Sequence, residues 1–535
     1  VALGYNSLFN NTTANNNTGV GTSALFANTT GANNTAVGSC ALKAATTASA
    51  NTAVGKSSLT ANTSGTGNVS IGNAMEANTE GNDNTALGNG ALQANTTADN
   101  NTAVGRLALK ANTTGETNVA VGHSALFANT TASSNVAVGT GAMCTTTTGA
   151  GNTAIGECAM KANTEGTLNV VVGHRAMCTN TTGNRNVALG QCTMKLNTTG
   201  SCNNAIGQFA LCANTSGCNN QAMGHSAMAS NTTGCQNVGI GQSALAANTT
   251  ASENTAIGFS AMTANTTGSS NVSVGARNLD ANTTGTNNVS VGRSGMGSNT
   301  TGANNTSIGQ GALSSNTTGE KNTALGALAN DTNTTGSRNV AVGYDSLTAN
   351  TSASDNTAVG NDSLRANTTG ANNVAVGKNA LVANTTGAEN TAVGCNALGA
   401  NTTATQNTAV GAFALDTNTT GTQNVAVGRS AMTANTTASC NTAVGWEAAP
   451  SVTTGTDNVV IGRCGTPNLT TGAGNITIGD AGNVSTRLFN IVGENNRLIA
   501  GHNNISNAYV KVAFTVTSDL RDKTNFGTVP HGLDF

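Results

Sequence analysis

A seventeen-residue unit recurs from the first residue of this 535-residue chain to about residue 479. One clean copy spans residues 373–389 and reads NVAVGKNALVANTTGAE. A glycine marks the register, because it recurs every seventeen residues from Gly4 to Gly72 and, after the loss of one residue, from Gly88 to Gly479. A repeat this short and regular is typical of solenoids, whose coils contact only their neighbours. We therefore expect residues 1–479 to form a solenoid shaft of about 28 coils.

Apolar residues within the unit predict two short strands per coil. Counting Asn373 as position 1, position 4 is aliphatic or Met in every coil, as at Val376, and position 9 is mostly Leu or Met, as at Leu381. Side chains alternate along a strand. We therefore expect strands at 373–377 and 379–383, with Val376 and Leu381 pointing inward toward each other. Two glycines and an Asn-Thr-Thr run leave no room for three helical turns, so the predicted fold is an all-β parallel β-solenoid, or β-roll.

The small residues at positions 3 and 8 are informative. Position 3 is Ala, Ser or Gly in almost every coil, as at Ala375, and position 8 is mostly Ala, as at Ala380. On the strand expected above, position 3 points outward, where a face in contact with water would contain long and charged residues. Two rows of small residues outside a thin core therefore suggest that another copy of the chain packs closely against this one. We expect a homo-oligomer, and a homotrimer in particular.

Glycine and asparagine have predicted structural roles. The glycine at position 5, as at Gly377, is present in every coil, which indicates a positive φ or a close backbone approach. The turn glycine at position 15 is replaced by Ala in some coils, so we expect no positive φ there. Asn373 at position 1 and Asn384 at position 12 are expected to stack as hydrogen-bonded ladders along the axis. Asn384 also begins an Asn-Thr-Thr glycosylation pattern, but the coil spacing favours the ladder.

The composition excludes several classes of partner. Charged residues make up 8% of the chain and the net charge is -2, so we expect no basic surface for nucleic acid. No run of 18 apolar residues occurs, so we expect no membrane insertion. Nothing in the repeat calls for a cofactor. The chain starts inside a repeat, and we expect a further segment before it.

The variable positions 6, 7, 10, 16 and 17 predict the solvent-facing side of the coil, where a ligand-binding surface would lie. His123, His174 and His225 all occupy position 6, three coils apart. That spacing separates them by about 14 Å, which is too far for a shared metal, so we interpret them as surface residues.

The twelve cysteines are unevenly distributed, and eight lie between Cys144 and Cys235. Cys218 and Cys235 occupy the same position in successive coils, about 4.8 Å apart, which suits a disulfide. Cys202 is nearly in register with Cys218 and competes for it. Two further pairs are out of register by about 10 Å and should not form within one chain: Cys144–Cys158 and Cys178–Cys192. No CxxC motif supports zinc.

The C-terminal region differs from the repeat. Residues 480–517 contain the runs RLFNIVG, NRLIAG and AYVKVAFTV, which predict strands of a connector or cap. Residues 518–535 begin SDLRDKTN and end GLDF. This ordered pattern resembles the start of the self-cleaving intramolecular chaperone at the C-terminus of phage endosialidases, tail spikes and tail fibres. The resemblance implies cleavage between Ser518 and Asp519, with Ser518 as nucleophile, Lys523 as its base and Asp519 as the first residue released. No other enzymatic activity is expected.

The coils themselves, with their VAVG and TAVG runs, resemble the heads of YadA-like trimeric adhesins and the repetitive shafts of phage and algal-virus tail fibres. This resemblance implies a left-handed parallel β-roll and a trimer. We expect the shaft of a viral or phage tail fibre, or a similar extracellular filament, that spaces or presents a tip binding a host-surface glycan or protein. The alternatives are a trimeric-autotransporter-like bacterial adhesin and an ice-binding solenoid with stacked Thr385 and Thr386. A glycan enzyme is disfavoured because no carboxylate pair recurs.

Overall fold

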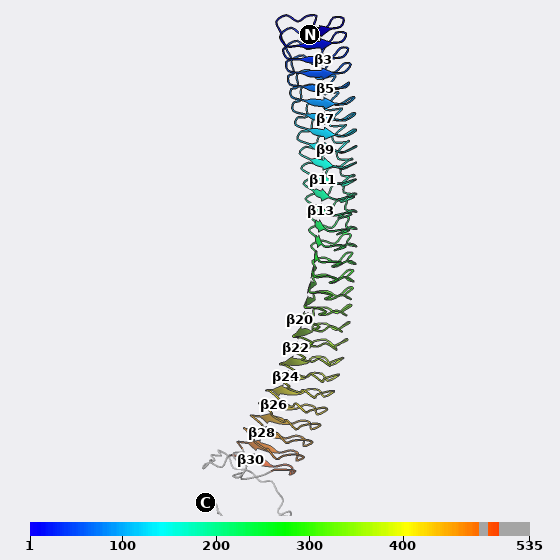
Figure 1. Ribbon diagram of the computed structural model, residues 1–535. Helices are drawn as coiled ribbons and strands as arrows, with labels where there is room; N and C mark the ends of the chain where they lie inside the picture. Colours follow the sequence, from blue (N-terminus) through cyan, green and yellow to red (C-terminus); the bar gives the residue numbers. More distant parts are fainter. Residues whose placement is uncertain (481–490, 502–535) are drawn as a thin grey trace, which may run out of the picture.

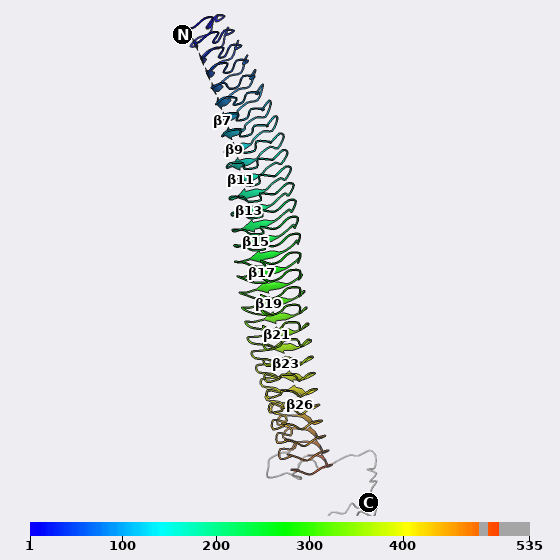
Figure 2. The same ribbon diagram turned by 90° about the vertical axis from the view of Figure 1, so that its right-hand side faces the viewer.

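Each copy of the repeat makes one coil, and the coils stack along a single, gently curved axis (Figures 1 and 2). The computed structural model describes residues 1–480 and 491–501. Within these residues there is no helix, and 30 short strands form one parallel sheet. Each strand pairs with the next one in the sequence, in register, so that Val374 lies opposite Thr391 and Val376 opposite Val393. The predicted parallel β-solenoid is therefore confirmed.

Nearly all strands are three residues long and occupy positions 2 to 4 of their coils. Their bounds are β1 Ala2–Leu3, β2 Thr18–Val20, β3 Thr35–Val37, β4 Thr52–Val54, β5 Val69–Ile71, β6 Thr85–Leu87, β7 Thr102–Val104, β8 Val119–Val121, β9 Val136–Val138, β10 Thr153–Ile155, β11 Val170–Val172, β12 Val187–Leu189, β13 Asn204–Ile206, β14 Gln221–Met223, β15 Val238–Ile240, β16 Thr255–Ile257, β17 Val272–Val274, β18 Val289–Val291, β19 Thr306–Ile308, β20 Thr323–Leu325, β21 Val340–Val342, β22 Thr357–Val359, β23 Val374–Val376, β24 Thr391–Val393, β25 Thr408–Val410, β26 Val425–Val427, β27 Thr442–Val444, β28 Val459–Ile461, β29 Ile476–Ile478 and β30 Leu498–Ala500.

Two coils depart from the seventeen-residue spacing without breaking the stack. Val69 lies opposite Thr85, sixteen positions later, where the repeat loses one residue. Ile476 lies opposite Leu498, twenty-two positions later. The latter pairing adds β30 beyond the last regular glycine, a rung that the fixed period did not reveal.

The predicted orientation of the strand is wrong. Ala375 is completely buried, and the neighbouring Val374 and Val376 point outward and remain partly exposed. The coil is narrow, so only a small side chain fits between the strand and the large residue across from it. Leu381 is that residue and is fully buried, as expected. Ala380 is buried too, so the small residues at positions 3 and 8 are small because they lie inside, and they are not evidence for a second chain.

The second predicted strand is also wrong, because residues 379–383 form turns. Asn379 and Leu381 both have left-handed backbones, with φ of 58° and 52°. A segment that contains two residues with positive φ cannot form a regular strand, because strand residues all have φ well below zero. The peptide groups still bond between coils: the Leu381 N–H donates to the Ala397 carbonyl oxygen at 3.0 Å.

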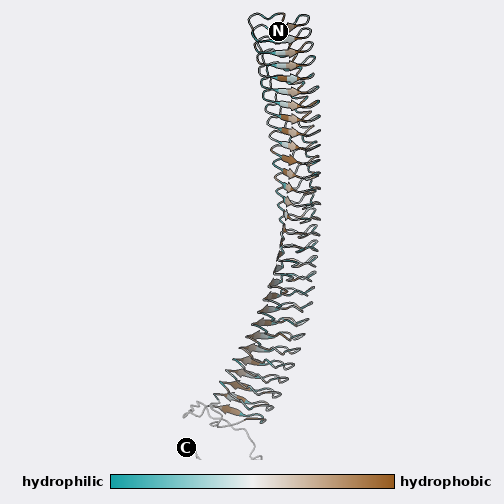
Figure 3. Ribbon diagram, viewed as in Figure 1, coloured by the Kyte–Doolittle hydropathy of each residue, from teal (hydrophilic) through white to brown (hydrophobic). Residues whose placement is uncertain are grey.

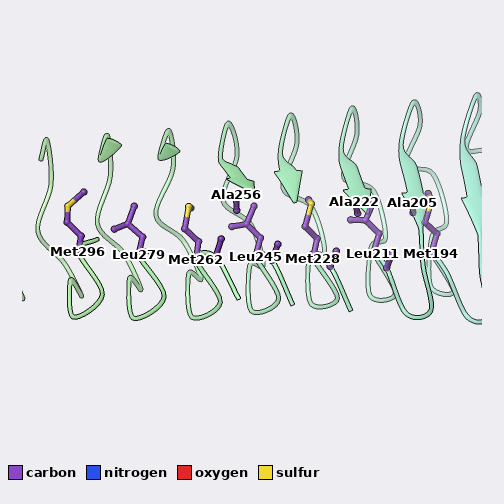
Figure 4. Packing of buried hydrophobic residues seen from close by; sticks show 14 of the residues in the cluster. Met194, Ala205, Leu211, Ala222, Met228, Leu245, Ala256, Met262, Leu279 and Met296 are labelled. Carbon is purple, nitrogen blue, oxygen red and sulfur yellow. The ribbon is translucent and has the colours of Figure 1, made fainter. Parts of the chain in front are cut away.

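The core is a single column of Leu and Met side chains flanked by alanines. Figure 4 shows part of this column, in which Met194, Leu211, Met228 and Leu245 follow one another along the axis. Most coils thus bury one large apolar side chain at position 9, and three have Asn330, Ala449 or Thr466 there instead. One coil has no core of its own, so its order depends on its neighbours above and below.

Candidate interaction surface

Two asparagine ladders hold the coils in register. The Asn373 N–H and Nδ2 both donate to Asn356 Oδ1 in the preceding coil, at 3.0 and 3.2 Å, and Nδ2 also donates to the Gly387 carbonyl oxygen at 2.9 Å. Asn373 Oδ1 in turn accepts from the Asn390 N–H at 3.0 Å. The side chain is completely buried, and its amide bonds in both directions along the axis. The predicted ladder at position 1 is confirmed.

The second ladder lies at position 12. Asn384 Nδ2 donates to Asn367 Oδ1 at 2.8 Å and to the Gly387 carbonyl oxygen at 2.9 Å. Because Asn384 is completely buried, the folded chain does not offer this amide for glycosylation. The ladder stops where position 12 is not Asn. For example, position 12 of the coil after Asn28 is Ala45, and the buried Asn28 Oδ1 has no hydrogen-bond partner.

The glycine at position 5 is required for both of the expected reasons. Gly377 has φ of +133°, and a Cβ placed on it would lie 2.6 Å from the Gly394 carbonyl oxygen in the next coil. Gly387, the turn glycine, has no left-handed φ, and Ala occupies its place at Ala404. The position-5 glycine directly follows the last strand residue in every described coil.

The outward side chains of this sheet form the candidate surface, which we call the apolar stripe. It consists of positions 2 and 4 in strands β1 to β30. Position 4 is Val, Ile, Leu or Met in every rung before Ala500, and position 2 is Val, Thr, Ile or Leu in all but two rungs. Leu87 is 43% exposed and Met223 is 49% exposed. No charged residue interrupts the stripe over its whole length, and Figure 3 shows the strands coloured toward brown along the shaft.

Other outward rows of the same coil are different. Position 6 holds Lys56, Arg106 and Glu157, all on the exposed side. At position 17, Arg338 forms an ion pair with Asp355, with Nε 2.6 Å from Oδ1, and this contact lowers the pKa of the Asp355 carboxyl. The shaft therefore has polar, charged sides and one continuous apolar side. Surfaces of this kind are typical of protein–protein contacts.

The threonine rows follow the turn. At position 13, the Thr385 N–H and Oγ1 both donate to the Thr402 carbonyl oxygen, at 2.8 and 3.0 Å. This row is therefore part of the backbone ladder. Thr386, at position 14, is exposed.

Within the described residues, the core column has two polar breaks at position 9, Asn330 and Thr466. Asn330 occupies position 9, is completely buried, and neither its Oδ1 nor its Nδ2 has a hydrogen-bond partner. Burial raises the pKa of the adjacent Asp331 carboxyl, and the nearby Asp345 adds to this effect. The coil at residues 322–338 therefore buries polar atoms that lack hydrogen-bond partners.

The structure brings Cys218 and Cys235 together. Their Sγ atoms lie 2.7 Å apart, and the Cys218 N–H also donates to Cys235 Sγ at 3.1 Å. The contact with Cys235, followed by burial, raises the pKa of the Cys218 thiol. Both residues are free thiols here, so the disulfide stays a prediction.

The three histidines at position 6 contact different neighbours. His123 lies 3.3 Å from Arg106, His174 lies 3.9 Å from Glu157, and His225 packs edge-on against Phe209. In residues 1–480 and 491–501, no group of three or more His, Cys, Asp or Glu side chains is placed to hold a metal ion. The same residues contain no helix that is long and apolar enough to cross a membrane.

Ser518, Asp519 and Lys523, the residues expected to carry out self-cleavage, lie outside the described residues, as does most of the predicted connector at 480–517. Within that connector, NRLIAG contributes strand β30 as predicted. Comparisons of the chain with protein-family models and with curated proteins found no match.

Proposed function

We propose that this chain is a structural fibre shaft whose copies assemble side by side along the apolar stripe. The observation that carries the proposal is the uncharged stripe, which continues through all 30 strands of the described residues. Strands spaced about 4.8 Å apart make this stack roughly 140 Å long. A long, regular stack with one apolar face for self-association is suited to a structural shaft that supports other domains and holds them at a distance.

The size of the stripe favours a second copy of the chain as the occupant. Thirty strands, each about 10 Å long and about 4.8 Å from the next, give an area on the order of 1,400 Å² per chain. A stable interface needs about 800 Å² per partner, and the largest apolar patch on a monomer is typically about 300–600 Å². A partner with the same rung spacing would match the stripe along its full length, and a copy of this chain has that spacing.

We propose a homotrimer in which the three stripes face a common axis. Each described coil has one such side, so the chains can close around the axis and leave the charged sides in water. The trimeric fibres that the repeat resembles make three the expected number. The same resemblance places the shaft in a virion tail fibre or similar extracellular filament, where it would hold a tip that binds a host glycan or protein. One self-cleavage between Ser518 and Asp519 would accompany maturation.

Sedimentation equilibrium of the whole chain tests this assembly, with three chain masses as the expected result. The double variant Val393→Lys and Val410→Lys places two charges on the stripe and should give monomers with an unchanged circular dichroism spectrum. The matched control, Cys395→Lys and Ala412→Lys, puts the same charges at position 6 of the same coils and should leave the assembly intact. A folded wild-type chain that sediments as a monomer at micromolar concentration would contradict the proposal.

The ice-binding alternative has weaker support. The Thr385 hydroxyl donates within the ladder, and the outward strand face has side chains of unequal length, such as Leu87, Met223 and Val376. A flat lattice of similar side chains would suit ice better. Thermal hysteresis in a solution of the chain would favour this alternative. The adhesin alternative needs the same shaft and differs in what the shaft is attached to.

A further inference from the structure

Only two rungs of the described sheet place an amide on the apolar stripe. Asn204 in β13 and Gln221 in β14 occupy position 2, where the other rungs have Val, Thr, Ile or Leu. The two side chains are bonded to each other, since Asn204 Nδ2 donates to Gln221 Oε1 at 2.8 Å. The stripe thus has one polar point, which lies in the middle part of the shaft.

A repetitive stripe leaves the alignment of two chains undetermined. Sliding one copy by one rung, about 4.8 Å, again places Val or Thr against Val or Thr. The slide therefore loses only the contacts of one terminal rung. A surface that is the same at every step specifies its register weakly, and a fibre built from it would have ragged ends.

We propose that Asn204 and Gln221 fix the chains in a parallel, in-register alignment; this inference rests on the proposed self-association. In that alignment the amide pairs of different chains meet. The bond within one chain uses the Asn204 amide nitrogen and the Gln221 carbonyl, so the Asn204 carbonyl and the Gln221 amide nitrogen can bond a neighbouring chain. A shift by one rung leaves one amide of each pair opposite Val, and a larger shift buries both against Val and Thr without partners, which is costly. A buried Asn sets the register of coiled coils for the same reason.

The position of the pair also selects the chain direction. In an antiparallel arrangement, β13 of one chain meets β14 of the other only if strand numbers in contact sum to 27 (13 + 14), so that β1 faces β26. Strands β27 to β30 would then have no partner. The parallel, in-register arrangement joins the amides and covers every described rung.

Photo-cross-linking measures the register directly. Benzoylphenylalanine in place of Val393, in β24, should cross-link the wild-type chain to β24 of its neighbour and the rungs next to it, as mapped by peptide mass spectrometry. In the double variant Asn204→Val and Gln221→Val, the sedimentation mass should be unchanged, because Val continues the stripe. Its cross-links should spread over several rungs. Adding Thr306→Asn and Thr323→Gln moves the amide pair to β19 and β20 and should restore a single register.

The outcomes separate this inference from the assembly on which it rests. A monomeric wild-type chain would overturn both. An oligomer whose cross-links stay on the same rungs in the Asn204→Val, Gln221→Val variant would overturn the role of the amides and leave the assembly standing. Scattered cross-links in the wild-type oligomer would do the same.

Discussion

Gly377 illustrates how tightly single residues are constrained in this stack. Its φ of +133° is unfavourable for any other residue, and the space for a Cβ is taken by the Gly394 carbonyl oxygen. We expect Gly377→Ala to lower the free energy of unfolding by about 2–4 kcal/mol, measured by urea denaturation. Gly399→Ala is the control, since Gly399 has no left-handed φ and the nearest atom to an added Cβ, the Asn396 carbonyl oxygen, would lie 3.3 Å away; it should cost at most about 1 kcal/mol. Equal effects of the two substitutions would contradict this explanation.

The broken asparagine ladder offers a stabilising change at the same scale. Asn28 Oδ1 is buried without a partner because the next residue in its row is Ala45. Ala45→Asn would supply the missing amide and should raise the stability by about 1 kcal/mol, seen as a higher melting temperature. Ala44→Asn, one position away, adds the same side chain outside the ladder. A similar gain in that control would show that the ladder is not the cause.

At the scale of the element, the coil shows what the sequence could and could not predict. The invariant glycines made the period and the parallel stacking predictable. The orientation of the strand was not predictable from alternation, because Ala375 and its neighbours Val374 and Val376 are all apolar. In this narrow coil the smaller residue lies inside. The complete lack of charge at positions 2 and 4, beside a charged position 6, was the signal of a continuous apolar surface outside the core.

The second predicted strand, at residues 379–383, was wrong for a different reason. Leu381 adopts a left-handed backbone, which Leu seldom does, and no local sequence pattern predicts this conformation. Asn373 and Asn384 were correctly predicted to form ladders, because their spacing follows the coil and not a surface motif. The sequence shows Asn204 and Gln221 as the two amides at position 2, where other coils have Val, Thr, Ile or Leu. Their proposed role became visible only when the structure showed that position 2 points outward.

The thiol pair also belongs to the scale of two adjacent coils. Cys218 and Cys235 are in contact, so treatment with oxidised glutathione should join them, with loss of two hydrogens and release of two reduced glutathione molecules. Peptide mapping should find the Cys218–Cys235 link, and the joined coils should melt at a higher temperature because the cross-link restricts the unfolded chain. Cys202→Ser is the control and should not alter the link. Recovery of Cys218 linked to Cys202 would show that the competing pair wins.

For the whole molecule, length should change in steps of one coil. Removing residues 305–389 takes out five complete coils, leaves every ladder in phase, and should give a folded shaft about 24 Å shorter. Removing residues 305–381 deletes a similar length but joins coils out of phase, and should disrupt folding around the junction. Electron microscopy and circular dichroism measure the two outcomes. Equal folding of both deletions would show that the phase of the repeat is unimportant.

The left-handed backbone at Asn379 and Leu381 has a consequence for how the protein comes to be made. A free seventeen-residue segment has no reason to hold these conformations, and it can acquire them only against a neighbour whose peptide groups already present the matching bonds. Folding should therefore resemble the growth of a crystal from a seed. The slow event is the formation of the first few coils, and every later one copies the template exposed at the growing end.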